Sequence, residues 1–159
     1  MKLIACLLLA SGVLAGSLPA QDPFSLPNGP RDQPLTASSG SDAVRMFFAM
    51  EPYVAHARAS WPEARRRFLA GLPARHTFFV TTRLRDAGGR IEQVFVAVDS
   101  VSDGRVHGRI WSQILVVEGY RLGQRYAFSE AELIDWMIAR PDGTTEGNIV
   151  GRFLDIYRP

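Results

Sequence analysis

The stretch His76–Ser100 reads HTFFVTTRLRDAGGRIEQVFVAVDS, and it decides the fold. Both halves are rich in β-branched and aromatic residues that alternate with polar ones, which is typical of strands. Ala87-Gly88-Gly89 separates the halves, and glycine readily adopts the positive φ angles of a tight turn. We therefore predict an antiparallel hairpin formed by residues 76–86 and 90–100.

Further short strands are predicted after the hairpin. Residues 104–114 (GRVHGRIWSQI) and 124–128 (QRYAF) each follow a turn that contains glycine. Residues 136–140 (WMIAR) precede the turn Pro141-Asp142-Gly143, and the end of the chain, TTEGNIVGRFLDIYRP, is predicted as a last strand that pairs back on them. The pattern indicates a sheet built from neighbours in the chain, which makes it mainly antiparallel.

Helical spacing of apolar residues is found before the hairpin. One helix is predicted from Ser41 or Asp42, either of which can cap it by accepting a backbone N–H bond. A second helix is predicted from Pro52 or Tyr53 to Ala70, with a break at Pro62. The predicted fold class is therefore α+β. N-terminal helices precede a mainly antiparallel, strongly curved or barrel-like sheet of about five to six short strands.

The first residues have the layout of an export signal. MKLIACLLLASGVLAGSLPA carries one lysine, an apolar run and then small residues, so residues 1–20 are predicted to be a secretory signal peptide. Cleavage is expected after Ala20 or after Ala15. The run is too short for a stable membrane anchor, and none is expected after cleavage. The predicted location is periplasmic or secreted.

The rest of the chain divides into a linker and one domain. Residues 21–41 are dense in Pro, Gly, Ser and Asn and are predicted to be a disordered linker, while residues 42–159 form a single domain. Cys6 is the only cysteine and lies in the signal peptide, so the exported chain has no disulfide and no thiol nucleophile. Its stability must come from its core.

The charge balance argues against one class of partner. Lys2 is the only lysine, so cleavage leaves 17 arginines against 16 acidic residues. A nearly neutral domain has no electrostatic reason to bind nucleic acid non-specifically. We expect no nucleic-acid partner.

The segment ELIDWMI (Glu132–Ile138) combines a helix start with a strand. Ser129 and Glu132 have the spacing of a capping box, which predicts a helical turn. Asp135 lies where that turn passes into the strand, and a carboxylate there can accept backbone N–H groups that lack partners. We favour this structural role over ligand binding. Trp136 is expected to anchor the core.

Motifs for catalysis or metal binding are missing from the sequence. The histidines His56, His76 and His107 have no metal-ligand spacing, and there is no HExxH motif, GxSxG motif or phosphate-binding loop. The stretch from Asp99 fails as a calcium loop because Val101 and Ile110 occupy ligand positions. We therefore assign no catalytic residue, no metal ligand and no cofactor.

From Tyr53 to Asp155 the chain resembles the domain of unknown function 2314 family (DUF2314) of small bacterial proteins. The resemblance rests on the hairpin FFVTTRLRDAGGRIEQVFVAV, the strand DGRVHGRI and, above all, LIDWMI followed by a turn and a glycine-bearing strand. Where the family has an acid–His pair and a Trp, this chain has Glu92-Gln93 and Phe95, so histidine chemistry is not carried over. The family implies a fold and no activity.

Three functions remain open from the sequence. The favoured one is a non-enzymatic exported domain that binds an envelope protein or small ligand through one face of its sheet. The first alternative is a hydrolase that uses Glu92 and Asp135 as acid and base. The second is an immunity or inhibitor protein. The expected binding face contains Glu92, Arg109, Trp111, Asp135 and Trp136.

Overall fold

The computed structural model describes residues 29–30 and 40–158. The predicted signal peptide, Cys6 and most of the predicted linker lie outside these residues. Two helices, six strands and one 3-10 turn make up the described chain. In chain order they are α1 (Gly40–Leu69), β1 (Thr77–Arg85), β2 (Ile91–Ser102), β3 (Arg105–Ile110), β4 (Arg125–Ser129), η1 (Glu130–Glu132), β5 (Asp135–Ala139), β6 (Thr145–Gly147) and α2 (Ile149–Ile156).

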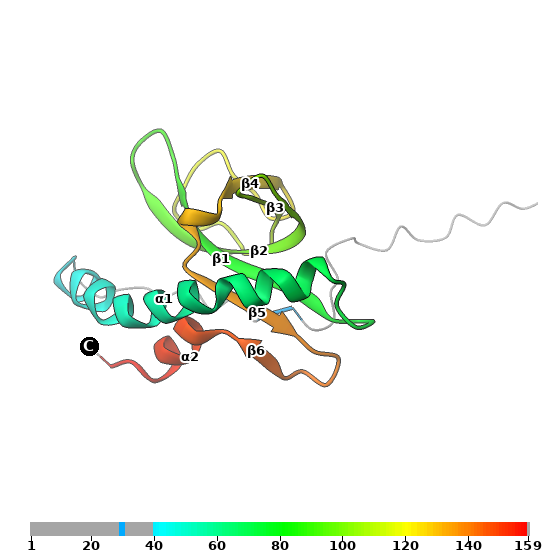
Figure 1. The fold of residues 1–159 in the computed structure, drawn as a ribbon. Coiled ribbons are helices and arrows are strands. Elements are labelled where there is room, and N and C mark those ends of the chain that lie inside the picture. The colour runs from blue at the N-terminus through cyan, green and yellow to red at the C-terminus, as the bar shows by residue number, and fades with distance from the viewer. Residues whose placement is uncertain (1–28, 31–39, 159) are drawn as a thin grey trace, which may run out of the picture.

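The strands form one antiparallel sheet in the order β4-β3-β2-β1-β5-β6. The predicted α+β class and the central hairpin are confirmed, with Val80 opposite Val96 in the β1–β2 register. Among the described residues β4 and β6 are the edge strands, so the sheet is open and the barrel-like closure is not found. Figure 1 shows β2, β3 and β4 curling away from the flatter part formed by β1, β5 and β6.

The two faces of the sheet follow from strand alternation, because successive side chains point to opposite sides. We call the face that carries Phe78, Val80 and Trp136 the inner face; α1 covers it, as Figure 1 shows. Phe78 stacks on Trp61 of α1 at 5.8 Å between ring centroids. The opposite face, which carries Phe79 and Met137, is the outer face. Most of the core therefore lies between α1 and the inner face.

Polar contacts fix α1 across the sheet. Trp136 Nε1 donates to Ser60 Oγ at 2.9 Å, and Arg58 Nε donates to the carbonyl of Leu133 at 2.8 Å. Trp61 Nε1 donates to the carboxylate of Glu130 at 2.6 Å. Because these bonds join α1 to η1 and β5, the position of the helix is set by the segment around Trp136.

One continuous helix replaces the two predicted ones. Pro52 and Pro62 both lie inside α1, although proline removes a backbone donor and usually breaks a helix. Both prolines are exposed, whereas Val54 and Trp61, which lie close to them in the chain, are buried. Burial along the helix therefore outweighs the local cost of the prolines, about 3 kcal/mol each.

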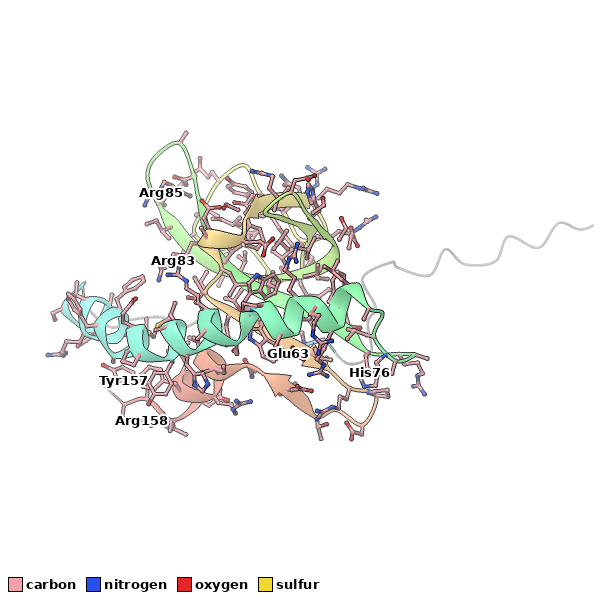
Figure 2. The ribbon with its side chains drawn as sticks, in the orientation of Figure 1. Glu63, His76, Arg83, Arg85, Tyr157 and Arg158 are labelled. Atoms are coloured by element: carbon pink, nitrogen blue, oxygen red, sulfur yellow. The ribbon has the colours of Figure 1, made fainter. Side chains whose placement is uncertain are left out.

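The N-terminal half of α1 extends past the sheet. In Figure 2, Arg83 of β1 points toward this half of the helix, and its guanidinium lies 4.7 Å from the centre of the Phe47 ring. Burial and the nearby guanidinium of Arg58 lower the pKa of Arg83. A cation–π contact thus joins the N-terminal half of α1 to the C-terminal end of β1.

The predicted last strand is wrong for most of its length. β6 has only three residues, and residues 149–156 form α2 instead. Asn148 turns the chain with φ of 52°, and Val150, Phe153 and Leu154 then pack against α1 at helical spacing. Their spacing is a sequence signal for a helix. The third predicted strand is also shorter than expected, since β3 ends at Ile110.

Gly147 is required where β6 meets β5. Its φ is 75°, and a Cβ added there would lie 2.3 Å from the carbonyl oxygen of Trp136. Gly143 in the preceding turn has φ of 82° and open space around it. An alanine at Gly143 therefore meets only the unfavourable φ, whereas an alanine at Gly147 meets the unfavourable φ and a steric clash.

We predict that Gly143→Ala lowers the free energy of unfolding by about 1 kcal/mol through φ alone. Gly147→Ala should cost about 1–3 kcal/mol more, because the added carbon must displace the Trp136 backbone. Urea denaturation of both variants measures the difference. Equal losses would show that the β5–β6 contact is not tight.

Candidate functional site

Asp135 is a buried carboxylate that caps α2. Its side chain is 2% exposed and lies on the outer face, opposite Thr81. Oδ1 accepts the N–H of Trp136 at 2.8 Å, and Oδ2 accepts the N–H of Val150 at 2.8 Å and of Gly151 at 3.4 Å. Asn148, the residue at the helix N-cap, makes no side-chain cap bond of its own. Asp135 has a structural role, as predicted, but only its bond to Trp136 is local, and its other two bonds cap α2.

The surroundings of Asp135 oppose its ionisation on balance. Burial raises the pKa of this carboxyl, while the backbone N–H groups of Val150 and Trp136 act in the opposite direction. Its oxygens face the N–H groups of α2, where the helix dipole favours a negative charge. The carboxylate has no exposed path to a substrate, and its acceptor positions are already used by the backbone.

Glu92 holds a loop. It pairs with Leu84 and so lies on the inner face, at the end of the β1–β2 hairpin. Oε1 accepts the N–H of Leu115 at 2.9 Å, and Oε2 accepts those of Val116 at 2.8 Å and Val117 at 3.1 Å. Val117 is thereby held in the core. Glu92 therefore replaces the missing strand partners of the chain that follows β3.

The two acids proposed for a hydrolase are not brought together. Glu92 lies on the inner face and Asp135 on the outer face, and each carboxylate accepts several backbone N–H bonds. An acid–base pair must converge on one substrate. Trp136 is also separated from Asp135, because its ring lies on the inner face against Phe78. The expected binding face is therefore divided by the sheet.

Arg109 and Trp111 lie together on the outer face. Trp111 is half-buried and contacts the ring of Phe79 edge-on, with 5.6 Å between centroids. Its backbone N–H donates to the carbonyl of Phe95 at 2.8 Å, which places it beside β2. We call the surrounding apolar cluster the Trp111 patch; it contains Phe79, Ala97, Trp111, Met137 and Ala139.

A groove of about 400 Å³ crosses β2, β3 and β4. Its lining residues are Asp99, Ser100, Ser102, His107, Gly108, Arg125, Tyr126 and Ala127. Asp99 is the extra residue of a β-bulge, since the register passes from Val98 opposite Gly108 to Ser100 opposite His107. We call this feature the β2–β4 groove.

Arg109 joins the groove to the Trp111 patch. Its guanidinium lies 3.9 Å from the carboxylate of Asp99, and its position on β3 faces Ala97. The two features therefore form one continuous surface, apolar over β1 and β5 and charged over β3 and β4. Sequence reasoning missed the groove because Asp99 reads as an ordinary turn acid. The bulge that brings it beside His107 has no local signature.

A distant part of the chain lies on the Trp111 patch. A Cβ added to Gly29 would lie 2.3 Å from Cζ2 of Trp111 and 2.7 Å from Nε1. The backbone of Gly29 therefore packs directly on the indole ring. This short segment, Gly29–Pro30, is the blue piece of chain in Figure 1. Composition alone predicted a disordered linker here.

Metal and membrane features are absent from the part of the chain that the structure describes. Within residues 29–30 and 40–158, no group of three or more His, Cys, Asp or Glu side chains could hold a metal ion. No helix among these residues is both long and apolar enough to cross a bilayer. In the same residues, every buried side-chain nitrogen and oxygen has a hydrogen-bond partner.

Removal of the Asp135 carboxylate should loosen α2. We predict that Asp135→Ala lowers the free energy of unfolding by about 2–3 kcal/mol, because buried N–H groups lose their acceptor. Asp135→Asn keeps one acceptor oxygen and should cost less. Amide hydrogen exchange at Val150 and Gly151 locates the effect. Asp155→Ala removes an exposed acid from the same helix and is the control, expected within about 0.5 kcal/mol of the wild type.

The raised pKa of Asp135 predicts a direction for pH dependence. Between the ordinary aspartate pKa and the raised value, the folded chain binds more protons than the unfolded chain, so the contribution of Asp135 to stability falls as pH rises. The stability advantage of the wild type over Asp135→Asn should therefore be largest at acid pH and decline through this window. Denaturant titrations across the window test this, and an advantage that grows with pH would contradict it.

Comparison with protein families, with curated proteins and with solved structures found no match to this chain. The resemblance to the domain of unknown function 2314 family therefore stays a prediction from sequence. No residue role is transferred from another protein.

Proposed function

We propose that this protein is a non-catalytic domain that binds a protein partner on the outer face of its sheet. The observation that carries the proposal is the continuity of the Trp111 patch with the β2–β4 groove through Arg109. Export to the cell envelope, as the N-terminal sequence predicts, is part of the proposal. So is membership of the domain of unknown function 2314 family.

The composition of this surface supports binding. Tryptophan and arginine are among the residues that contribute most of the energy at protein interfaces, and the outer face presents Trp111, Arg109 and Arg125. Asp99 and His107 add hydrogen-bonding groups beside them. An apolar anchor next to charged groups is the usual organisation of an interface centre and its rim.

The fate of the acids supports a non-catalytic role. Glu92 and Asp135 both accept backbone bonds that hold the fold, so they would have to abandon these bonds to exchange protons with a substrate. An immunity or inhibitor protein would also need a protein-binding face. The identity of the captured partner separates that alternative from other envelope binding.

We predict that Trp111→Ala reduces partner capture from envelope extracts at least tenfold, as expected for loss of an aromatic anchor. Arg125→Glu changes an exposed groove residue and should also reduce capture. Phe48→Ala removes an aromatic side chain that is exposed on α1, away from this face, and is the matched control. Quantitative mass spectrometry of the captured proteins gives the ratio, and melting temperatures confirm that each variant is folded.

If Trp111→Ala and Arg125→Glu are folded and capture the same proteins in the same amounts as Phe48→Ala, the outer face is not the binding surface.

A further inference from the structure

We infer that the outer face takes an extended glycine–proline peptide, and that its resident ligand is this chain's own Gly29–Pro30 segment. The inference rests on the proposed function and specifies its ligand. A partner would then present a similar segment and displace the resident one.

The contact at Gly29 is too close for any side chain. A Cβ there would lie 2.3, 2.6 and 2.7 Å from three atoms of the Trp111 indole. Real Cβ atoms essentially never approach a ring so closely, so an added Cβ would force the indole or the segment to move. The indole therefore selects a residue without a side chain, which makes glycine a specificity requirement of the site.

Burial on the outer face agrees with a covered site. Phe79 is 0% exposed and Met137 is 3% exposed, although both point away from α1. Trp111 and Ala97 are half-buried at the border of the same cluster. The patch therefore resembles an occupied interface, and Gly29 is in contact with its most accessible aromatic ring.

The sequence around the contact suits an extended ligand. Pro30 follows Gly29 directly, and Pro27 and Pro34 lie nearby in LPNGPRDQP. Proline restricts the backbone before binding, so less conformational entropy is lost when the peptide is ordered. Aromatic-lined surfaces commonly recognise such segments. Both predicted cleavage sites precede Gly29, so the exported chain keeps the segment.

The short connection to α1 gives the resident segment an advantage. Only residues 31–39 separate Pro30 from the start of α1. A short linker holds an attached ligand at an effective concentration on the order of millimolar. A partner in solution must compete with that concentration, so its apparent affinity is lower than its affinity for the open face.

The test uses Gly29→Ala in the exported chain, which should expel the segment and leave the patch intact. Gly88→Ala in the exposed β1–β2 turn is the control, since an added Cβ there would lie 3.3 Å from Asp86 Oδ1, a tight contact that a shift of a few tenths of an ångström relieves. With 5-fluorotryptophan, the ¹⁹F resonance of Trp111 is assigned from Trp111→Phe. We expect Gly29→Ala to shift this resonance and increase its solvent isotope effect, while Trp61 and Trp136 stay unchanged.

A second measurement tests the ligand class. The probe is a synthetic peptide with residues 24–34 of this chain, FSLPNGPRDQP. It should bind the Gly29→Ala protein at least tenfold more tightly than the wild type. The same peptide with alanine in place of Gly29 should not bind either protein.

The outcomes separate this inference from the proposed function. An unchanged Trp111 resonance in Gly29→Ala, or equal binding of the glycine and alanine peptides, overturns the inference and leaves the capture experiment to stand separately. If the resonance shifts and the peptide binds, but Trp111→Ala and Phe48→Ala capture equally, the intramolecular site stands and the partner-binding function falls.

Discussion

The arrangement of this protein depends on two neighbouring residues that point to opposite faces of one strand. Trp136 enters the core on the inner face and donates its indole N–H to Ser60 of α1. Asp135 turns to the outer face and accepts the first N–H groups of α2. Two adjacent residues of β5 therefore fix both helices relative to the sheet, because Trp136 is bonded to α1 and Asp135 is bonded to α2.

Other acidic side chains also accept hydrogen bonds that hold separate segments together. Glu92 supplies the acceptors for a loop that has no strand partner, and Glu130 accepts the indole N–H of Trp61. Glu146 accepts from Arg67 and Arg140 and so ties α1 to β6. A buried or half-buried carboxylate that satisfies several donors is costly to divert. These acids therefore act in holding the fold together.

Several features of the site were accessible from sequence and several were not. Trp111 and Arg109 were assigned to one binding face as an aromatic residue and an arginine near a strand end, and the structure places both on the outer face. Glu92 and Asp135 were assigned to the same face, and the sheet separates them. The error arose because each residue was placed from its own segment. Whether Glu92 of β2 and Asp135 of β5 share a face depends on the registers in which both strands pair with β1. The local sequence around either residue does not contain that information.

The sequence by itself determined the elements whose causes are local. Alternation and the glycine turn specify the β1–β2 hairpin, and Ser129 with Glu132 specifies the capping box, which the structure contains. Only the tertiary structure decided that α1 continues through Pro52 and Pro62, that α2 is capped by Asp135, and that Gly29 lies on Trp111. The physical reason is distance along the chain. Burial and hydrogen bonds between remote residues outweigh local preferences, and they exist only once the chain is folded.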